Sequence, residues 1–199
     1  MLITAISLYL LFIYYSASLY TDEESLYITV HQTFYSFEII IIDDGSPDQT
    51  GKICLRIAAE YPYVRYIYQE HQGAGAARNK GLRVANGEYV LFLDADDYWV
   101  NRDLLKELYN CFKNQNVDLV MFQMDKYTEK GRLLKRYRKK AFPDTKLCHC
   151  VHEIYPMLVR DGQVLASACN KCVKRSLLEE EYILFPEGGY AEDIDWVIQ

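Results

Sequence analysis

The 199-residue sequence lacks internal repeats, low-complexity linkers and any excess of basic residues. A composition that is 50% hydrophobic and 25% charged argues against intrinsic disorder and against a coiled coil. Lys and Arg number 22 against 28 Asp and Glu, which gives a net charge of −6. Because phosphate contacts need clustered basic side chains, we expect no nucleic-acid partner. The length predicts one domain with a sizeable core.

The first 20 residues contain no charged side chain. A membrane-spanning helix needs about 20 apolar residues, so this segment has nearly the length of an anchor. A signal peptide normally carries Lys or Arg ahead of its apolar stretch, and none is present here. A buried strand with its flanks is the third alternative. The regular pattern that follows favours the strand, which we place within residues 8–15.

Cysteine is too sparse, at six residues, for a small secreted disulfide scaffold. Reduced thiols in a cytoplasmic protein are therefore expected. A zinc site is the alternative, although a Cys-x-Cys half is unusual for zinc. The residues that could form such a site are Cys148, His149, Cys150, His152, Cys169 and Cys172.

Apolar, β-branched runs alternate with segments of helical pattern from residue 37 onward. This alternation predicts an α/β fold with a mostly parallel sheet and helices on both of its faces. Residues 8–15 would supply a central strand, whose burial on both sides explains the continuous apolar run. The other strands are expected at residues 37–42, 64–68, 89–93 and 117–122, with helices at residues 49–61, 73–85 and 104–112.

The pattern weakens after residue 122. Six of the ten residues at 131–140 are Lys or Arg, and we expect residues 126–140 to form a hairpin or loop in solvent. The alternative is a patch that touches an anionic membrane surface or a phosphate-bearing acceptor. Helical pattern returns at residues 147–160 and 173–180.

Two of the expected strands end in acidic clusters, Asp43-Asp44 and residues 94–97. Ligands of open α/β sheets bind at the carboxyl ends of the strands, so these carboxylates would share one edge. Their mutual repulsion needs a cation or a ligand rich in donors to offset it. Carboxylate oxygens suit Mg²⁺ or Mn²⁺. Taken alone, an acidic turn is more often a solvated loop or a helix cap.

Two further stretches carry candidate chemistry. Residues 73–81 match neither a Rossmann fingerprint nor a Walker A loop, but Arg78 and Lys80 could neutralise a diphosphate or the acidic cluster. An ordinary buried ion pair is the alternative for Arg78. After a glycine-rich loop, Glu192 and Asp193 open a helical segment and could include a general base. The alternative is the common acidic bias of helix N-termini, which contributes about 0.3–1 kcal/mol.

Together these stretches resemble a bacterial family 2 glycosyltransferase of the kind that builds surface polysaccharides. The resemblance covers about residues 25–199, with the motifs in the expected order. It is carried by FEIIIIDDGSPDQTGKIC, QGAGAARNKGLRVANGEYVLFLDADDYW, ASACNKCVKRSLL and FPEGGYAEDIDW. It implies a GT-A fold in which residues 1–122 bind a nucleotide sugar and residues 123–199 form the acceptor-binding part.

The resemblance also implies residue roles. Asp43 or Asp44 would bind the base or ribose of a UDP-sugar, with Arg78 near the base. Asp94 and Asp96 would form the Asp-x-Asp motif, in which Asp96 is the main ligand of Mg²⁺ or Mn²⁺. The catalytic base would be Asp193, and Asn170 with Lys171 would belong to the acceptor side. The implied reaction transfers a sugar with inversion to a hydroxyl of a glycan or polyprenyl-linked acceptor.

The chain departs from the family pattern in two places. At residues 13–17 the Pro, Tyr and Asn of the usual first turn are not at their places, and the sequence ends six residues after Asp193. We therefore expect the acceptor-binding part to be incomplete at its C-terminal end. We expect a cytoplasmic protein that can associate peripherally with the inner face of the membrane. The alternatives are an inactive remnant that binds nucleotide or partners another transferase, and a nucleotidyltransferase.

Overall fold

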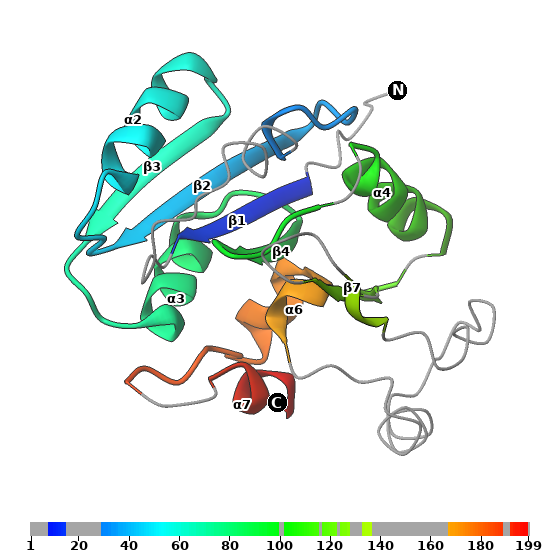
Figure 1. The fold of residues 1–199 in the computed structure, drawn as a ribbon. Helices are drawn as coiled ribbons and strands as arrows, with labels where there is room; N and C mark the ends of the chain where they lie inside the picture. Colours follow the sequence, from blue (N-terminus) through cyan, green and yellow to red (C-terminus); the bar gives the residue numbers. More distant parts are fainter. Residues whose placement is uncertain are drawn as a thin grey trace.

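A computed structural model describes residues 8–14, 29–99, 102–115, 117–122, 124–127, 133–136, 167–188 and 192–198 (Figure 1). Its main element is a six-stranded sheet in the order β3-β2-β1-β4-β8-β5. None of the helices within the described residues has the length and hydropathy that a membrane crossing requires. The predicted α/β class, with strands and helices alternating through the first half of the chain, is confirmed.

Strand β1 (Leu8–Tyr14) lies inside the sheet, between β2 (Phe37–Asp44) and β4 (Tyr89–Asp94). It pairs in parallel with both neighbours along its length. The uncharged N-terminal run thus contains the central strand that the sequence predicts, and residues 1–7 and 15–20 lie outside the described residues. Strand β3 (Val64–Gln69) pairs in parallel with the other side of β2.

Helices cover both faces of the sheet because successive residues of β2 point to opposite sides. Ile39 and Ile41 pack with α2 (Thr50–Glu60) and α4 (Leu104–Gln115) in one apolar cluster. Ile40 and Ile42 pack on the other face with α3 (Ala74–Val84), α6 (Arg175–Glu180) and α7 (Glu192–Ile198). All four isoleucines are at most 1% exposed, so β2 lies at the centre of the core.

The far end of the sheet differs from the prediction. The expected helix at residues 173–180 divides into strand β8 (Lys171–Lys174) and a shorter helix α6 (Arg175–Glu180). Strand β8 runs antiparallel between β4 and β5 (Leu119–Met121). The helical interpretation is confirmed for residues 175–180 and was wrong only for Val173 and Lys174, because these residues pair with neighbouring strands, where ladder pairing outweighs local helical pattern.

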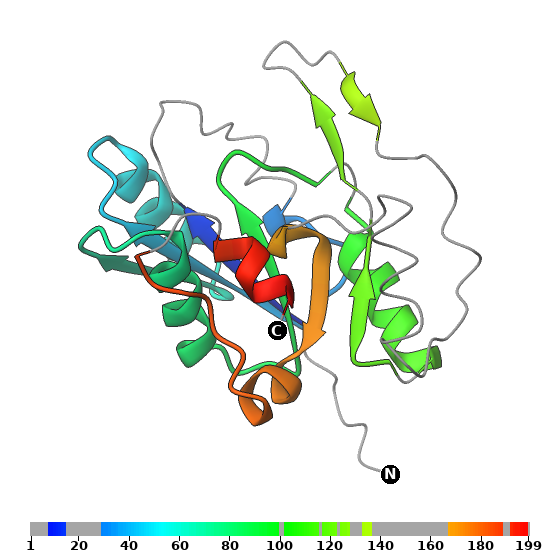
Figure 2. The same ribbon diagram turned by 90° about the horizontal axis from the view of Figure 1, so that it is seen from below.

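The remaining elements come from the C-terminal part of the sequence. Strands β6 (Asp125–Tyr127) and β7 (Leu133–Arg136) form a separate antiparallel hairpin, as expected for this basic stretch, and it projects away from the main sheet (Figure 2). A single 3-10 turn, η1 (Ala168–Asn170), precedes β8. The final helix is α7 (Glu192–Ile198). The predicted helix at 147–160 lies outside the described residues.

Candidate active site

The two acidic strand ends lie on either side of β1. In the register of the parallel strands, Asp43 is level with Tyr14, and Asp94 is level with Ile13. The chain crosses over β1 between β3 and β4, which makes this edge a point where the strand order reverses direction. Open α/β sheets bind their ligands in the crevice at such a point. The backbone therefore places the two acidic clusters at one edge of the sheet, as the sequence predicts.

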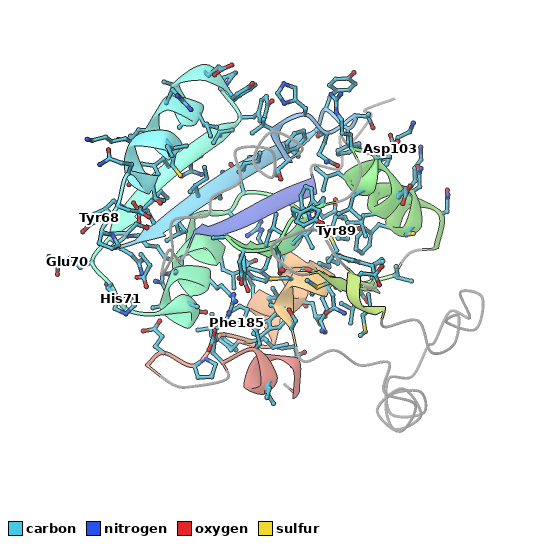
Figure 3. All side chains as sticks on the ribbon, in the orientation of Figure 1. Tyr68, Glu70, His71, Tyr89, Asp103 and Phe185 are labelled. Atoms are coloured by element: carbon cyan, nitrogen blue, oxygen red, sulfur yellow. The ribbon has the colours of Figure 1, made fainter. Side chains whose placement is uncertain are left out.

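Asp44 has a fully buried carboxylate that organises the loop between β3 and α3. Oδ1 accepts from Gln69 Nε2 at 2.7 Å and from the Gln72 backbone N–H at 2.8 Å. Oδ2 accepts from the Gly73 N–H at 2.8 Å and lies 2.9 Å from His71 Nδ1. Four partners occupy the roughly four acceptor positions of a carboxylate. Figure 3 shows His71 in this loop, next to the start of α3.

Asp43 is also buried but makes fewer contacts. Its Oδ1 accepts from the Ser46 N–H at 2.9 Å, and Oδ2 accepts from the Tyr66 hydroxyl at 2.6 Å. Burial and then this hydrogen bond raise the pKa of Tyr66, so the phenol stays a donor. Each carboxylate oxygen of Asp43 thus has one partner and can accept a further hydrogen bond, whereas each oxygen of Asp44 already has two partners.

Arg78 joins the second acidic cluster to the C-terminal helix. It is 2% exposed, and its Nη2 donates to Asp94 at 2.8 Å (Oδ1) and 3.1 Å (Oδ2). Nη1 donates to Glu192 Oε1 at 2.9 Å and lies 2.7 Å from Asp193 Oδ1. Burial alone would lower the pKa of Arg78, but Asp94 and Asp193 outweigh it and raise the pKa. Arg78 therefore forms the buried ion pair that the sequence offered as its alternative role.

Asp193 stands at the first turn of α7 with its carboxylate largely enclosed. Burial raises its pKa, with Arg78 opposing that shift and the Asp94 charge adding to it. The Ala168 backbone N–H of η1 donates to the same carboxylate. A carboxylate that is buried, oriented by two groups and shifted toward proton binding has the properties of a general base.

The Asp94 cluster contains a group of ligand atoms that could hold a cation. The side-chain ligand atoms of Asp94, Asp97 and Cys169 all lie within 4.8 Å of one another. Burial, together with the charges of Asp94 and Asp96, raises the pKa of Asp97 to about 7. Burial also raises the pKa of Cys169, so its thiol stays protonated and is a poor ligand. The carboxylates fit a hard cation, and Asp96 is exposed beside them.

The segment that follows α6, around Phe185 and Pro186, packs against α3 through contacts that the sequence pattern does not indicate. Asn79 donates from Nδ2 to the Phe185 carbonyl at 2.8 Å and accepts from the Phe185 N–H at 2.9 Å. A Cβ on Gly75 would lie 2.3 Å from the Pro186 carbonyl oxygen, so only glycine permits this approach. The Phe185 ring stacks on Trp196 of α7 at 4.8 Å between centroids.

Asn170 and Lys171 are buried behind Asp193. Asn170 Nδ2 donates to the Phe122 carbonyl at 3.1 Å, which ties η1 to the end of β5. Lys171 Nζ donates to the Ser167 carbonyl at 2.6 Å and to Asn170 Oδ1 at 2.7 Å. Burial lowers the pKa of Lys171 to about 8, although the Asp193 charge opposes this shift. Sequence reasoning placed this pair on the acceptor side and did not connect it with Asp193.

Two candidates from the sequence remain, Lys80 and the zinc alternative. Lys80 Nζ donates to the Tyr68 carbonyl at 3.2 Å, rather than pairing with the Asp94 cluster. Cys169 and Cys172 are free and buried, and the other half of the zinc alternative, Cys148 and Cys150, lies outside the described residues.

The family of the chain follows from comparison with known proteins. The model of glycosyl transferase family 2 matches residues 19–182, which include both acidic strand ends and the Arg78 helix. The chain belongs to this family. The resemblance read from the motifs is thereby confirmed, and so is the expected GT-A fold, since the structural neighbours are glycosyltransferases.

Curated relatives and solved structures agree with the family. A putative glycosyltransferase EpsH of Bacillus subtilis is 29% identical over 165 residues, covering 83% of this chain and 46% of that protein. A cholesterol galactosyltransferase of Borreliella burgdorferi is 33% identical over 176 residues, covering 85% of this chain and 48% of that protein. The chain therefore spans about half the length of these family 2 relatives.

A solved structure of Staphylococcus aureus TarS, residues 1–349 with UDP-GlcNAc, superposes with a TM-score of 0.75 at 26% identity. The match covers 96% of this chain and 52% of that 1–349 chain. A Pyrobaculum calidifontis mannosyltransferase with GDP-Man and Mn²⁺ has a TM-score of 0.67 at 23% identity, covering 97% of this chain and 51% of that one. At that identity the second likeness shows the fold alone.

Proposed function

We propose that this family 2 chain transfers a sugar from a nucleotide-diphosphate sugar to a hydroxyl of a glycan or lipid-linked acceptor, with inversion. The observation that carries the proposal is the position of Arg78, which contacts both Asp94 at the sheet edge and Asp193 on α7. It brings a candidate cation-binding carboxylate and a candidate base into one cluster, as a displacement reaction requires.

The donor would bind along the carboxyl edge of the sheet. Asp43 retains acceptor capacity and is suited to the base or ribose of the nucleotide, whereas Asp44 would act by holding the 69–73 loop in place. The TarS structure contains UDP-GlcNAc, which supports a UDP-sugar as the first donor to test. Arg78 would contribute its charge at the pyrophosphate end, since it lies with Asp94.

Asp94 and Asp96 would hold Mg²⁺ or Mn²⁺, with Asp97 in reach of the same ion. Burial is the main cause of the raised pKa of Asp97, and the charges of Asp94 and Asp96, which Arg78 only partly offsets, add to it and support this assignment. When bound, such a cation stabilises the charge that develops on the leaving diphosphate.

Asp193 would supply the base. The acceptor hydroxyl gives its proton to the Asp193 carboxylate while its oxygen forms a bond to the anomeric carbon. The bond from that carbon to the diphosphate breaks, and its electron pair leaves with the diphosphate. A single displacement of this kind inverts the anomeric centre, and its transition state is oxocarbenium-like, as in glycoside hydrolysis.

In this proposal residues 1–122 form the nucleotide-sugar-binding part and residues 123–199 belong to the acceptor-binding part. The acceptor would be a glycan or a polyprenyl-linked sugar, and no nucleic acid is expected at an acidic chain. Peripheral association with the inner face of the membrane, in a cytoplasmic protein, would draw on the basic residues at 131–140.

The first experiment is a thermal-shift screen of UDP-sugars and GDP-sugars with and without Mn²⁺. A ligand raises the unfolding temperature by mass action if the native site binds it. We expect a UDP-sugar to do so more strongly with Mn²⁺. Nucleotide release is then measured with donor alone and with donor plus a lipid-linked glycan. Binding without acceptor-dependent release identifies a nucleotide-binding remnant, and a lack of both contradicts the proposed function.

A further inference from the structure

Lys171 is a buried lysine to which the proposed reaction assigns no step. It is 4% exposed, although lysine is almost never fully buried unless paired. Its Nζ donates to the Ser167 carbonyl at 2.6 Å and to Asn170 Oδ1 at 2.7 Å. These two acceptors stand at the two ends of η1. The ammonium group therefore closes this single turn from inside the protein.

The closed turn faces the candidate base. The Ser167 hydroxyl accepts from the Cys169 N–H at 3.1 Å and fixes the start of η1. A backbone hydrogen bond from Ala168 to the Asp193 carboxylate of α7 opposes the effect of burial on the pKa of Asp193. Helix α7 packs against both η1 and α3, as the view from below shows (Figure 2). Asp193 is thus held between Arg78 on α3 and the Ala168 amide on η1.

From this geometry we infer that Lys171 is a positioning residue for Asp193, acting through η1 rather than through contact with substrate. Without the ammonium group, the Ser167 carbonyl and Asn170 amide lose their shared donor, and the turn is free to relax. The Ala168 N–H then moves away from the carboxylate, while Arg78 still holds the other side. The inference rests on the proposed role of Asp193 and adds the support for that role.

The test compares Lys171→Met with Lys174→Met. Both remove an ammonium group from β8, but Lys174 is only partly buried, and its Nζ lies 3.5 Å from Oδ1 of the exposed Asp118. Lys171→Met is expected to lower kcat for nucleotide release by between about tenfold and a hundredfold, since small displacements of a reacting group are costly. Donor KM and UDP affinity should stay within about twofold, because the donor edge is untouched. Lys174→Met should match the wild type.

A second readout needs no turnover. The chemical shift of the Asp193 carboxyl carbon and the exchange protection of the Ala168 amide should both change in Lys171→Met and not in Lys174→Met. Lys171→Gln, which keeps one N–H donor group, replaces Lys171→Met if that variant does not fold and should show the same changes in smaller degree. Equal kcat in the Lys171 and Lys174 variants, or an unchanged Asp193 signal, overturns the inference. If the wild-type protein releases no nucleotide, the proposed function is contradicted instead. The Asp193 chemical shift and the Ala168 amide exchange then still test the role of Lys171.

Discussion

Arg78 Nη1 lies 2.7 Å from Asp193 Oδ1, and the same guanidinium donates to both carboxylate oxygens of Asp94. One buried cation therefore connects the end of β4 with the first turn of α7. Three acidic groups surround it, since Glu192 also accepts from Nη1 at 2.9 Å. This side chain therefore adds ion pairs to the apolar contacts that Trp196 makes between the C-terminal helix and the rest of the core.

Arg78→Met should destabilise the fold by about 3–5 kcal/mol, because it leaves buried carboxylates without their counter-charge. The free energy of unfolding from urea titration measures this loss. Arg83→Met is the matched control, since Arg83 lies in the last turn of the same helix and is exposed. It should change stability by no more than about 0.5 kcal/mol. Equal losses in the two variants would show that the Arg78 ion pairs contribute nothing.

Asp97→Asn should change how stability depends on pH. Burial and the neighbouring charges of Asp94 and Asp96 raise the pKa of Asp97 to about 7 in the folded protein, against the ordinary aspartate pKa of 3.8 in the unfolded chain. Between these values the folded state binds a proton that the unfolded state has released, so the Asp97 contribution to stability falls as pH rises. The asparagine variant lacks this loss. Its unfolding temperature should rise relative to the wild type from pH 4 to pH 8, and a constant difference would contradict the assignment.

Asp44→Asn should loosen the 69–73 loop. An amide in place of the carboxylate presents one acceptor oxygen instead of two, and its NH₂ faces groups that donate, so about 1–3 kcal/mol should be lost. Asp48→Asn is the control, because Asp48 accepts from the Thr50 N–H at 2.9 Å and asparagine serves equally well near a helix start. Urea denaturation of both variants measures the difference. If the free energy of unfolding of Asp44→Asn equals that of the wild type, Asp44 does not hold the loop in place and is available to bind nucleotide directly.

The sheet was largely predictable because most of its parallel strands are short apolar runs, and two of them, β2 and β4, end in acidic clusters. Residues 89–93 and 64–68, for example, match β4 and β3 to within a residue. Strand β8 was not predictable, since four residues carry too little periodicity and its pairing partners are distant in sequence. The position of β1 was inferred only because the rest of the sheet required it.

The site, like the sheet, has parts that the sequence predicts and parts that only the structure shows. Adjacent acidic residues at strand ends marked Asp43, Asp44 and Asp94, because parallel strands bring their carboxyl ends together. No sequence period marks Asn79, which is fixed by Phe185 of a distant segment. The meeting of η1 with α7 is likewise a tertiary packing event, so the link between Lys171 and the candidate base became visible only in the structure.

The most direct test of the proposed reaction is nucleotide release by Asp193→Asn. The amide keeps the size of the side chain but cannot take the acceptor proton, so transfer should be abolished. UDP affinity, measured by calorimetry with Mn²⁺, should stay close to the wild type because the donor edge is unchanged. Asp118→Asn, at an exposed carboxylate on the far side of β8, should retain full turnover. Acceptor-dependent release in the wild type that disappears in Asp193→Asn is the predicted result, and near-normal turnover in that variant would contradict the account.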